Sequence, residues 1–394
     1  MKISRRGFLG VAAGAGVIMD PRAVVWAARQ VVTLPQSSQP QAGGQQAAPN
    51  LEPWVGTPQP YPYVTTRSAV SVVKGESRRK NITDALIAID DQIRPVLKTK
   101  KYVILKPNCV SQVPLGTTKA EALMGILDYL APRYKGPIMI CEASGNTMGN
   151  FEALGYPKIV EQHKNQHVTL VDLNAEAKYQ VVMAFDYHAH VIPIRLAARL
   201  LDPDAYIICC AVMKTHNAQV ATLTLKNMVL GAPLSAPPKE TPRWSDKRKM
   251  HVGMRMMQVN MMLTAQKLRP CWGAGVIDGY EGMEGNGPHQ GTPVPHRIAI
   301  ASTDYLAADR VGVEAMGIDA SWVGSLVYSY QVGLGQYDID KIDIRGEKIA
   351  DVRRVYRLHP DVEQEREWMR PMDQLPSRLG RNLPSVEEDL SAYA

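Results

Sequence analysis

Four groups of polar residues, each directly after a short apolar segment, hold the side chains of this sequence that could carry out chemistry. They occupy positions 106–108, 142–145, 214–217 and 278–288. Continuous apolar segments of this kind are typical of strands buried in a parallel sheet, and ligands bind beyond the carboxyl ends of such strands. We therefore expect the four groups to converge at one rim of a sheet and to form a site there.

Lysine and asparagine dominate the first and third groups and the segment that follows the third. Lys106, Lys214 and Lys226 would form a cationic pocket, to which Asn108 and Asn227 would add neutral donors. Lysine offers a compact charge that suits phosphate or carboxylate, or an amine for Schiff-base chemistry when burial depresses its pKa. The alternative is that each lysine pairs with a carboxylate from a neighbouring loop. The pattern favours a small anionic molecule as the ligand.

Histidines supply the candidate proton carriers. His216 lies in a polar turn two residues after Lys214, and an imidazole in that position acts as a general base or as a metal ligand. We assign His216 and Lys214 as catalytic candidates. His251 is a ligand-binding candidate early in a predicted helix, and the alternative for it is a capping or core histidine.

The group at 278–288 contains three carboxylates, four glycines and one asparagine. Carboxylate and carbonyl oxygens in a glycine-rich loop suit a hard divalent cation such as Mg²⁺ or Ca²⁺. We expect Asp278 and Glu284 to be the metal ligands, Glu281 and Glu284 to act as catalytic bases, and Asn286 to bind the ligand. The alternatives are a charge-balanced empty site, in which these carboxylates face the lysines, and a glycine-rich hairpin with solvated charges.

The second group adds Glu142 and Ser144 as ligand-binding candidates. Both lie where a helix would begin, and the free N–H groups at a helix N-terminus bind anions. The alternative for Ser144 is that its hydroxyl only caps the turn that follows.

The five cysteines argue against a metal cluster held by thiolates. None of them forms a C-x-x-C pair, whereas an iron–sulfur cluster or a structural zinc site needs clustered thiolates. Each cysteine lies in or beside an apolar segment, so we expect small buried side chains rather than ligands. The cofactor is therefore unknown, a divalent metal is the candidate, and an iron–sulfur cluster is not expected.

The periodicity of apolar residues alternates between strand and helix from about residue 63 onwards. This alternation predicts an α/β fold with a mostly parallel sheet, flanked by helices on both faces, in one large domain over 63–350 and a C-terminal extension over 351–394. Strands are predicted at 64–73, 101–105, 137–141, 167–172, 205–212, 272–277, 296–301 and 341–345. Helices are predicted at 81–97, 118–131, 151–164, 196–201, 250–268 and 304–316.

The N-terminus has the pattern of an export signal. The run Ser4-Arg5-Arg6-Gly7-Phe8-Leu9 matches the twin-arginine pattern and is followed by a weakly apolar segment and a small-residue cleavage site. We therefore predict a signal over 1–28, recognition by the twin-arginine export machinery, a periplasmic or other extracytoplasmic location, and a Pro/Gln/Ala-rich tether over 29–62.

Composition narrows the classes of partner. The chain has 394 residues, 45% hydrophobic and 21% charged, and a formal net charge of +7. Residues 1–27 carry a net charge of 3, so the mature chain keeps only +4 and nucleic acid is not an expected partner. No uncharged apolar stretch of about 18 residues or more follows the N-terminus, so no membrane span is expected in the mature protein.

Ordered motifs along the chain resemble the bacterial and archaeal family called domain of unknown function 362. They are Lys106-Pro107-Asn108, Lys214-Thr215-His216, the run Thr222-Leu223-Thr224-Leu225-Lys226-Asn227, the group at 278–288, Ser302-Thr303-Asp304 with Ala307-Ala308-Asp309, and Gly333-Leu334-Gly335. The resemblance spans residues 70–346. Many members carry a ferredoxin-like segment with four spaced cysteines, which this chain lacks, and the layout is similar to that of a twin-arginine-exported branch.

Three functions remain open from the sequence, because the family has no established activity. The first is an exported enzyme that acts on a small anionic ligand with divalent-metal assistance. The second is a periplasmic ligand- or metal-binding accessory protein without catalysis. The third is a redox partner that uses a cofactor its sequence does not reveal.

Overall fold

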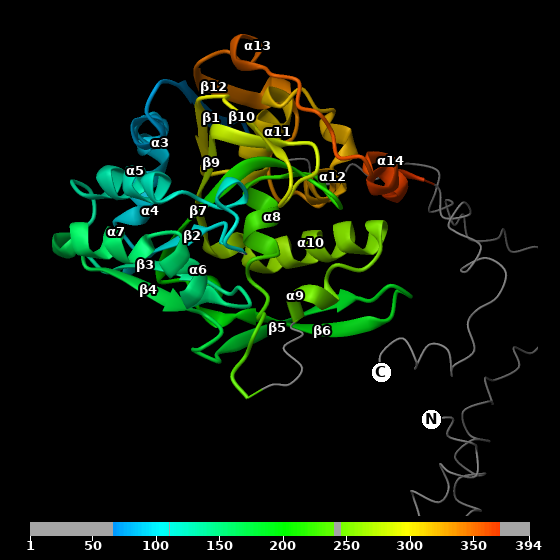
Figure 1. The fold of residues 1–394 in the computed structure, drawn as a ribbon, viewed down its shortest axis with the longest axis horizontal. Coiled ribbons are helices and arrows are strands. Elements are labelled where there is room, and N and C mark those ends of the chain that lie inside the picture. Colours follow the sequence, from blue (N-terminus) through cyan, green and yellow to red (C-terminus); the bar gives the residue numbers. More distant parts are fainter. Residues whose placement is uncertain (1–65, 110, 240–245, 371–394) are drawn as a thin grey trace, which may run out of the picture. The chain divides into compact units, whose positions relative to one another are not determined.

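The computed structural model describes residues 66–109, 111–239 and 246–370 (Figure 1). The chain divides into two units, 1–59 and 60–394, and all the described residues belong to the second. The predicted signal and tether lie outside the described residues, and so does the end of the predicted C-terminal extension.

A large twisted sheet forms the centre of the described chain. Eight of its ten strands follow one another in the order β12-β1-β11-β9-β7-β2-β3-β4, while β10 pairs with β9 and β8 pairs with β7. The strands are β1 (Ser68–Lys74), β2 (Tyr102–Pro107), β3 (Ile138–Glu142), β4 (Val168–Asp172), β7 (Ala205–His216), β8 (Val220–Thr222), β9 (Trp272–Glu284), β10 (Thr292–Val294), β11 (Ile298–Ser302) and β12 (Ile342–Gly346).

The sheet is mostly parallel, as predicted. The pairs β9–β7, β7–β2, β2–β3, β3–β4 and β1–β12 are all parallel, and within the eight-strand path only β11 runs against its neighbours. Strand β7 lies near the middle, and every one of its residues is buried. The carboxyl ends of β2, β3, β7 and β9 therefore reach the same side of the sheet.

Helices cover both faces of the sheet, which confirms the predicted α/β class. The buried apolar residues form two separate clusters, one on each face of the sheet. Ile207 and Cys209 of β7 belong to the first cluster, and Ile208 and Cys210, which point to the opposite face, belong to the second. The second face carries α3 (Arg78–Ile87), α4 (Asp90–Leu97), α5 (Ala120–Leu130), α6 (Thr147–Ala153) and α7 (Tyr156–Gln162). The first carries α8 (Thr224–Val229), α10 (Met254–Leu268), α11 (Tyr305–Ala315) and α12 (Gly324–Gln331).

Short elements complete the described chain. A separate antiparallel hairpin, β5 (Tyr179–Phe185) and β6 (Val191–Ala197), packs on α10 and was not predicted (Figure 1). The remaining helices are α9 (Asp246–Lys249), α13 (Ile349–Val352) and α14 (Val362–Glu365). No helix of the described ranges is long and apolar enough to cross a bilayer.

Several predicted elements differ from those observed. The helix predicted over 81–97 is two helices, α3 and α4, and the one predicted over 151–164 is α6 and α7. The second break falls at Gly155, whose φ of +74° is a left-handed conformation that favours glycine. The helix predicted over 196–201 is only a short 3₁₀ turn, because its first residues belong to β6. The loop predicted at 278–288 is strand as far as Glu284.

Candidate functional site

A cavity of about 210 Å³ opens beyond the carboxyl ends of β2 and β7. We call it the cationic cavity. The end of β2, strands β7 and β8, helix α8, and segments near α9 and after β9 all contribute to its wall. Its lining residues are Asn108, Lys214, His216, Thr222, Lys226, Asn227, Leu230, Gly231, Lys247, His251, Pro288 and His289.

The structure brings together six of the residues that the sequence singled out for chemistry, namely Asn108, Lys214, His216, Lys226, Asn227 and His251. It also adds residues that sequence reasoning did not select. Lys247 sits in the charged run Asp246–Lys249, where nothing in the sequence distinguishes it from its neighbours. Thr222 begins one of the recognised motifs and His289 directly follows another, so their position alone could have indicated them.

Three lysines and three histidines face this cavity, and no aspartate or glutamate of the described residues lines it. Lys214 is fully buried, and its Nζ donates to Asn108 Oδ1 at 3.1 Å and to the carbonyl oxygen of Gly116 at 2.5 Å. Burial, followed by the nearby charge of Lys247, lowers the pKa of Lys214 to about 7. The described residues therefore stabilise its ammonium form poorly.

Lys226 and Lys247 lack an acceptor for their Nζ atoms among the described residues. Burial lowers the pKa of both, and the charges of Lys214 and Lys247 lower the pKa of Lys226 further, to well below its usual range. The charge of Glu142, which is already paired with Lys106, raises the pKa of Lys247 and so opposes part of this effect. No carboxylate acts on Lys226 in this way, and cations that repel one another gain most from an anion placed between them.

The two histidines that the sequence selected differ in their hydrogen bonds. His216 Nδ1 accepts from the backbone N–H of Ala218 at 3.1 Å, so the proton of the neutral ring resides on Nε2. Burial, then the charges of Lys226 and Lys214, depress the pKa of His216 well below 6.5. His251 Nδ1 lies 2.8 Å from the carbonyl oxygen of Lys247, to which it donates, so its Nε2 is an acceptor. His216 thus offers an N–H, and His251 offers a lone pair.

The asparagines fix the geometry of the wall. Asn108 donates from Nδ2 to Asn227 Oδ1 at 3.0 Å, while its own Oδ1 accepts from Lys214. Asn227 donates from Nδ2 to Cys209 Sγ at 3.2 Å, which ties helix α8 to the centre of β7. The backbone N–H of Asn108 donates to Thr118 Oγ1 at 2.8 Å. Because its side chain is held at both ends, Asn108 presents a fixed acceptor to Lys214.

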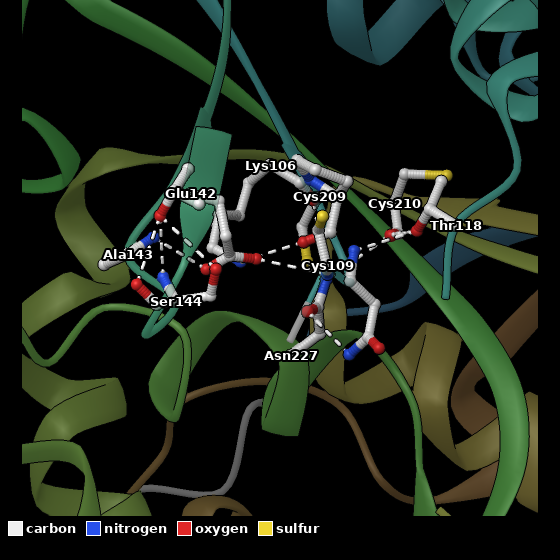
Figure 2. Close-up of polar contacts among 12 residues, drawn as sticks. Lys106, Cys109, Thr118, Glu142, Ala143, Ser144, Cys209, Cys210 and Asn227 are labelled. Carbon is white, nitrogen blue, oxygen red and sulfur yellow. Dashed lines mark hydrogen bonds and ion pairs between the residues drawn. The ribbon is translucent and has the colours of Figure 1, made fainter. Parts of the chain in front are cut away.

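Lys106 and Glu142 do not line the cavity; they form an ion pair behind it. Lys106 Nζ lies 2.7 Å from Glu142 Oε2, both side chains are completely buried, and Figure 2 shows them turned toward each other. Glu142 also accepts from the backbone N–H groups of Ala143 and Cys109. Gly231 lines the cavity and lies against Lys106, because a Cβ added there would lie 2.5 Å from Lys106 Nζ. The alternative reading of a paired lysine therefore holds at Lys106.

Ser144 also has a local role. Its Oγ accepts from Asn150 Nδ2 at 3.2 Å and contacts Thr147 Oγ1 at 3.3 Å, while its backbone N–H donates to Thr147. These contacts organise the turn from β3 into α6, so Ser144 does not reach the cavity.

The carboxylates of the acidic group have separate partners in the structure, and the metal site expected from the sequence stays a prediction. Asp278 is buried against Arg78, with 3.1 Å between Oδ2 and Nε, and burial raises the pKa of its carboxyl. Glu284 accepts from the backbone N–H of Arg357 at 2.9 Å. Asp278 and Glu284 thus have different partners, Arg78 and Arg357, and β9 is irregular between them.

The other acidic-group candidates also lie outside the lining. Glu281 is 4.0 Å from Lys119 Nζ, and Asn286 Oδ1 contacts His359 Nε2 at 2.9 Å. Neither residue faces Lys214 or Lys226 in the cavity wall. Among the described residues, no group of three or more His, Cys, Asp or Glu is placed to hold a metal ion. All five cysteines are buried, as expected from their apolar surroundings.

An α/β protein with a cationic cavity at the carboxyl ends of parallel strands is the class that this fold and site define. The chain belongs to the family described as "Domain of unknown function (DUF362)", which matches residues 103–314, more than half of the chain. Every residue that lines the cavity lies within the matched range. No curated protein matches the chain.

Two solved structures share a weak likeness with the chain. A crystal structure of a Thermotoga maritima protein has 12% identity and a TM-score of 0.35, over 54% of this chain and 52% of that one. The lactate racemase apoprotein of Thermoanaerobacterium thermosaccharolyticum has 14% identity and a TM-score of 0.39, over 64% of this chain and 58% of that one. The chain spans a little over half the length of both, and likeness of this degree says nothing about activity.

Proposed function

We propose that this protein is an enzyme that binds a small anionic molecule in the cationic cavity and moves a proton on it. One observation carries the proposal: three lysines and three histidines line the cavity without a carboxylate among the described residues. A protein gains nothing from gathering unpaired cations unless an anion joins them, since each buried charge costs free energy when it is left alone.

A buried hydroxyl supports the same conclusion. Thr222 lines the cavity, and its Oγ1 is buried without a hydrogen-bond partner within the described chain. Buried polar atoms are nearly always paired, so an unpaired one in a cavity wall indicates a group that a ligand satisfies. Together with Lys226 and Lys247, this hydroxyl supplies donors suited to carboxylate or phosphate oxygens.

The other side chains that line the cavity have different chemical roles. Lys226 and Lys247 neutralise the ligand, and Lys214 presents an amine or ammonium held by Asn108 and Gly116. His216 donates from Nε2, and His251 accepts at Nε2, so the cavity offers a proton donor and a proton acceptor as neutral imidazoles. The carboxylates expected to hold a divalent metal lie elsewhere, and no step of the proposal passes through a metal.

We also propose that the protein works outside the cytoplasm, in the twin-arginine-exported branch without a ferredoxin-like segment. The arginine pair at 5–6, the weakly apolar run after it and the absence of clustered cysteine pairs in the sequence support this placement.

Calorimetric titration of the full chain with phosphate and with oxalate tests the binding proposal. We expect saturable binding of one anion per chain, and loss of affinity of about 10- to 100-fold in Lys226→Met or Lys247→Met, since a hydrogen bond to a charged group contributes about 1.5–3 kcal/mol. Lys348→Met is the matched control: it removes the same charge from an exposed position outside the cavity and should leave affinity unchanged.

The proposal is wrong if neither anion binds, or if Lys348→Met weakens binding as much as the cavity variants do. Saturable binding with no turnover over a panel of small acids and phosphate esters would instead support the accessory-protein alternative.

A further inference from the structure

The amine of Lys214 has an unusual set of partners. An ammonium group carries three N–H donors, whereas a neutral amine carries two donors and one lone pair. Lys214 Nζ has two acceptors, Asn108 Oδ1 at 3.1 Å and the Gly116 carbonyl oxygen at 2.5 Å, and no carboxylate among the described residues pairs with it. The two acceptors use both hydrogens of a neutral amine and leave its lone pair available to an atom in the cavity.

The surroundings keep that amine in place and oppose its protonation. Strand β7 carries Lys214 between β8 and β9, with Thr222 and Met283 opposite it, and its side chain is about 1% exposed. Lys226 and Lys247 share the cavity, and a buried lysine close to another cationic group, as Lys214 is to Lys247, is activated as a nucleophile. Lys106 provides the contrast, because its ammonium is paired with Glu142.

The three cavity lysines therefore have different roles. Lys214 is held rigidly by two hydrogen bonds, which suits a nucleophile that must meet a reacting carbon. Lys226 and Lys247 have no acceptor in the described chain and are only partly buried, which suits side chains that close on an anionic group.

We propose that Lys214 forms an imine with the carbonyl group of a small compound that also carries an anionic group, which Lys226 and Lys247 hold. This inference deepens the proposed function, on whose anion site it rests. A cavity of about 210 Å³ accommodates a compound of a few carbon atoms that carries both groups.

The reaction balances without an oxidant or a reductant. The amine lone pair attacks the carbonyl carbon and a carbon–nitrogen bond forms, after which the carbonyl oxygen leaves with the two amine protons as one molecule of water. His216 lies two residues further along β7, so its side chain is on the same face of the strand as Lys214. Its Nε2–H donates to the carbonyl oxygen, and the ring then takes up a proton from the nitrogen.

Reductive trapping tests the proposal on the full-length chain. The protein is incubated with pyruvate, and separately with dihydroxyacetone phosphate, in the presence of sodium cyanoborohydride; peptide mass spectrometry then locates the adducts. We expect one adduct per chain on Lys214 with at least one probe, at least 10-fold faster than on the exposed Lys348, and suppressed by excess phosphate. The two probes distinguish a carboxylate from a phosphate as the anionic group.

Variants of the cavity lysines distinguish a failure of the imine proposal from a failure of the proposed anion site. Lys214→Arg replaces the amine by a guanidinium that forms no imine, so it should abolish the adduct while phosphate still binds. Lys226→Met should raise the probe concentration needed for half-maximal trapping. Wild-type protein that binds phosphate but is modified only on exposed lysines, or on Lys226 rather than Lys214, overturns the imine and leaves the anion site standing. Protein that neither binds phosphate nor traps a probe overturns both proposals. The competition by phosphate uses wild-type protein, so it does not depend on how a variant folds.

Discussion

Buried lysines in this protein have two different environments a short distance apart. Lys106 is paired with a carboxylate and lies against Gly231, whereas Lys214 meets only neutral acceptors. Both side chains are equally buried, and both follow an apolar stretch of strand, so the identity of the residue does not determine its role. The role of each lysine depends on whether a carboxylate such as Glu142 lies at hydrogen-bond distance from its Nζ.

The pair of Lys106 and Glu142 gives a prediction at this scale. Glu142→Gln removes the carboxylate and leaves the ammonium of Lys106 buried without a counter-charge, which we expect to lower the free energy of unfolding by about 3–5 kcal/mol. Urea denaturation of the full chain followed by circular dichroism measures the change.

The control for this substitution is Glu347→Gln, which removes the same charge at an exposed position and should change stability by less than about 0.5 kcal/mol. Equal stabilities of Glu142→Gln and the wild type would show that Lys106 gives up its proton freely, and would contradict a structural role for the pair.

Residues that lie C-terminal to the range matched by the family, 103–314, hold the rim of the cavity in place. We call residues 353–370 the C-terminal strap. The backbone of Arg357 accepts from the N–H of Gly285 at 2.7 Å and donates to Glu284, and His359 contacts Asn286. The strap therefore binds the end of β9 and the turn after it, close to the segment that places His289 in the cavity wall.

Glu365 in the strap gives a prediction for the hairpin that carries His216. Its Oε2 accepts from the backbone N–H of Val220 at 2.5 Å, and Val220 has a φ of +59°, which is rare for a β-branched residue. Glu365→Ala leaves this N–H unpaired, so we expect a loss of about 1–3 kcal/mol in the free energy of unfolding and weaker phosphate binding. Urea denaturation and calorimetric titration measure the two effects.

Glu365→Gln retains the shape and an acceptor oxygen, and burial already raises the pKa of Glu365 to about 7, so this variant should remain close to the wild type. Should the alanine and glutamine variants have the same stability and affinity, Glu365 would not hold the turn.

The local pattern of apolar residues was enough to predict the buried strands that lie between parallel neighbours. The positions of Lys214 and His216 could be predicted because β7 is apolar throughout its first part, and parallel strands share a rim. Residues 278–284 could not, because their glycines and acids are typical of a loop, and only pairing with β10 and β11 makes them strand. Lys247 and the strap approach the site through contacts distant in sequence, which local periodicity does not reveal.

Charged side chains throughout the described chain also differ in whether a group of opposite charge lies beside them. The chain carries a formal net charge of +7, and many of the described arginines and lysines near the surface lie beside carboxylates, as Arg79 does with Asp128 and Arg345 with Asp91. Exposed lysines without a carboxylate beside them are solvated, whereas Lys214, Lys226 and Lys247 face one cavity whose described lining holds no carboxylate. An anionic ligand therefore meets a local field that the overall balance conceals.

This local charge makes the stability of the ligand-free protein depend on pH. The pKa of Lys214 is about 7 in the folded state and near 10.4 in the unfolded chain, and the pKa values of Lys226 and Lys247 are also lowered. Between pH 7 and pH 8.5 these lysines therefore bind more protons in the unfolded chain than in the folded one, so their contribution raises stability with pH by up to about 1.4 kcal/mol per pH unit for each lysine. Asp309 and Glu365, whose pKa values burial raises to about 7, oppose this rise just above pH 7. Above about pH 9 the buried cysteines reverse the trend, because burial raises the pKa of their thiols in the folded state only.

Urea denaturation at pH 7.0 and pH 8.5 measures this slope, and phosphate provides the decisive comparison. A bound anion stabilises the ammonium forms and binds the folded state alone, so saturating phosphate should raise stability more at pH 7.0 than at pH 8.5 and flatten the slope. Lys214→Met should also reduce the slope, whereas Lys348→Met should leave it unchanged. If phosphate raises stability equally at the two pH values and Lys214→Met keeps the wild-type slope, the cavity lysines do not carry this pH dependence, and the cavity is not the place where an external anion binds.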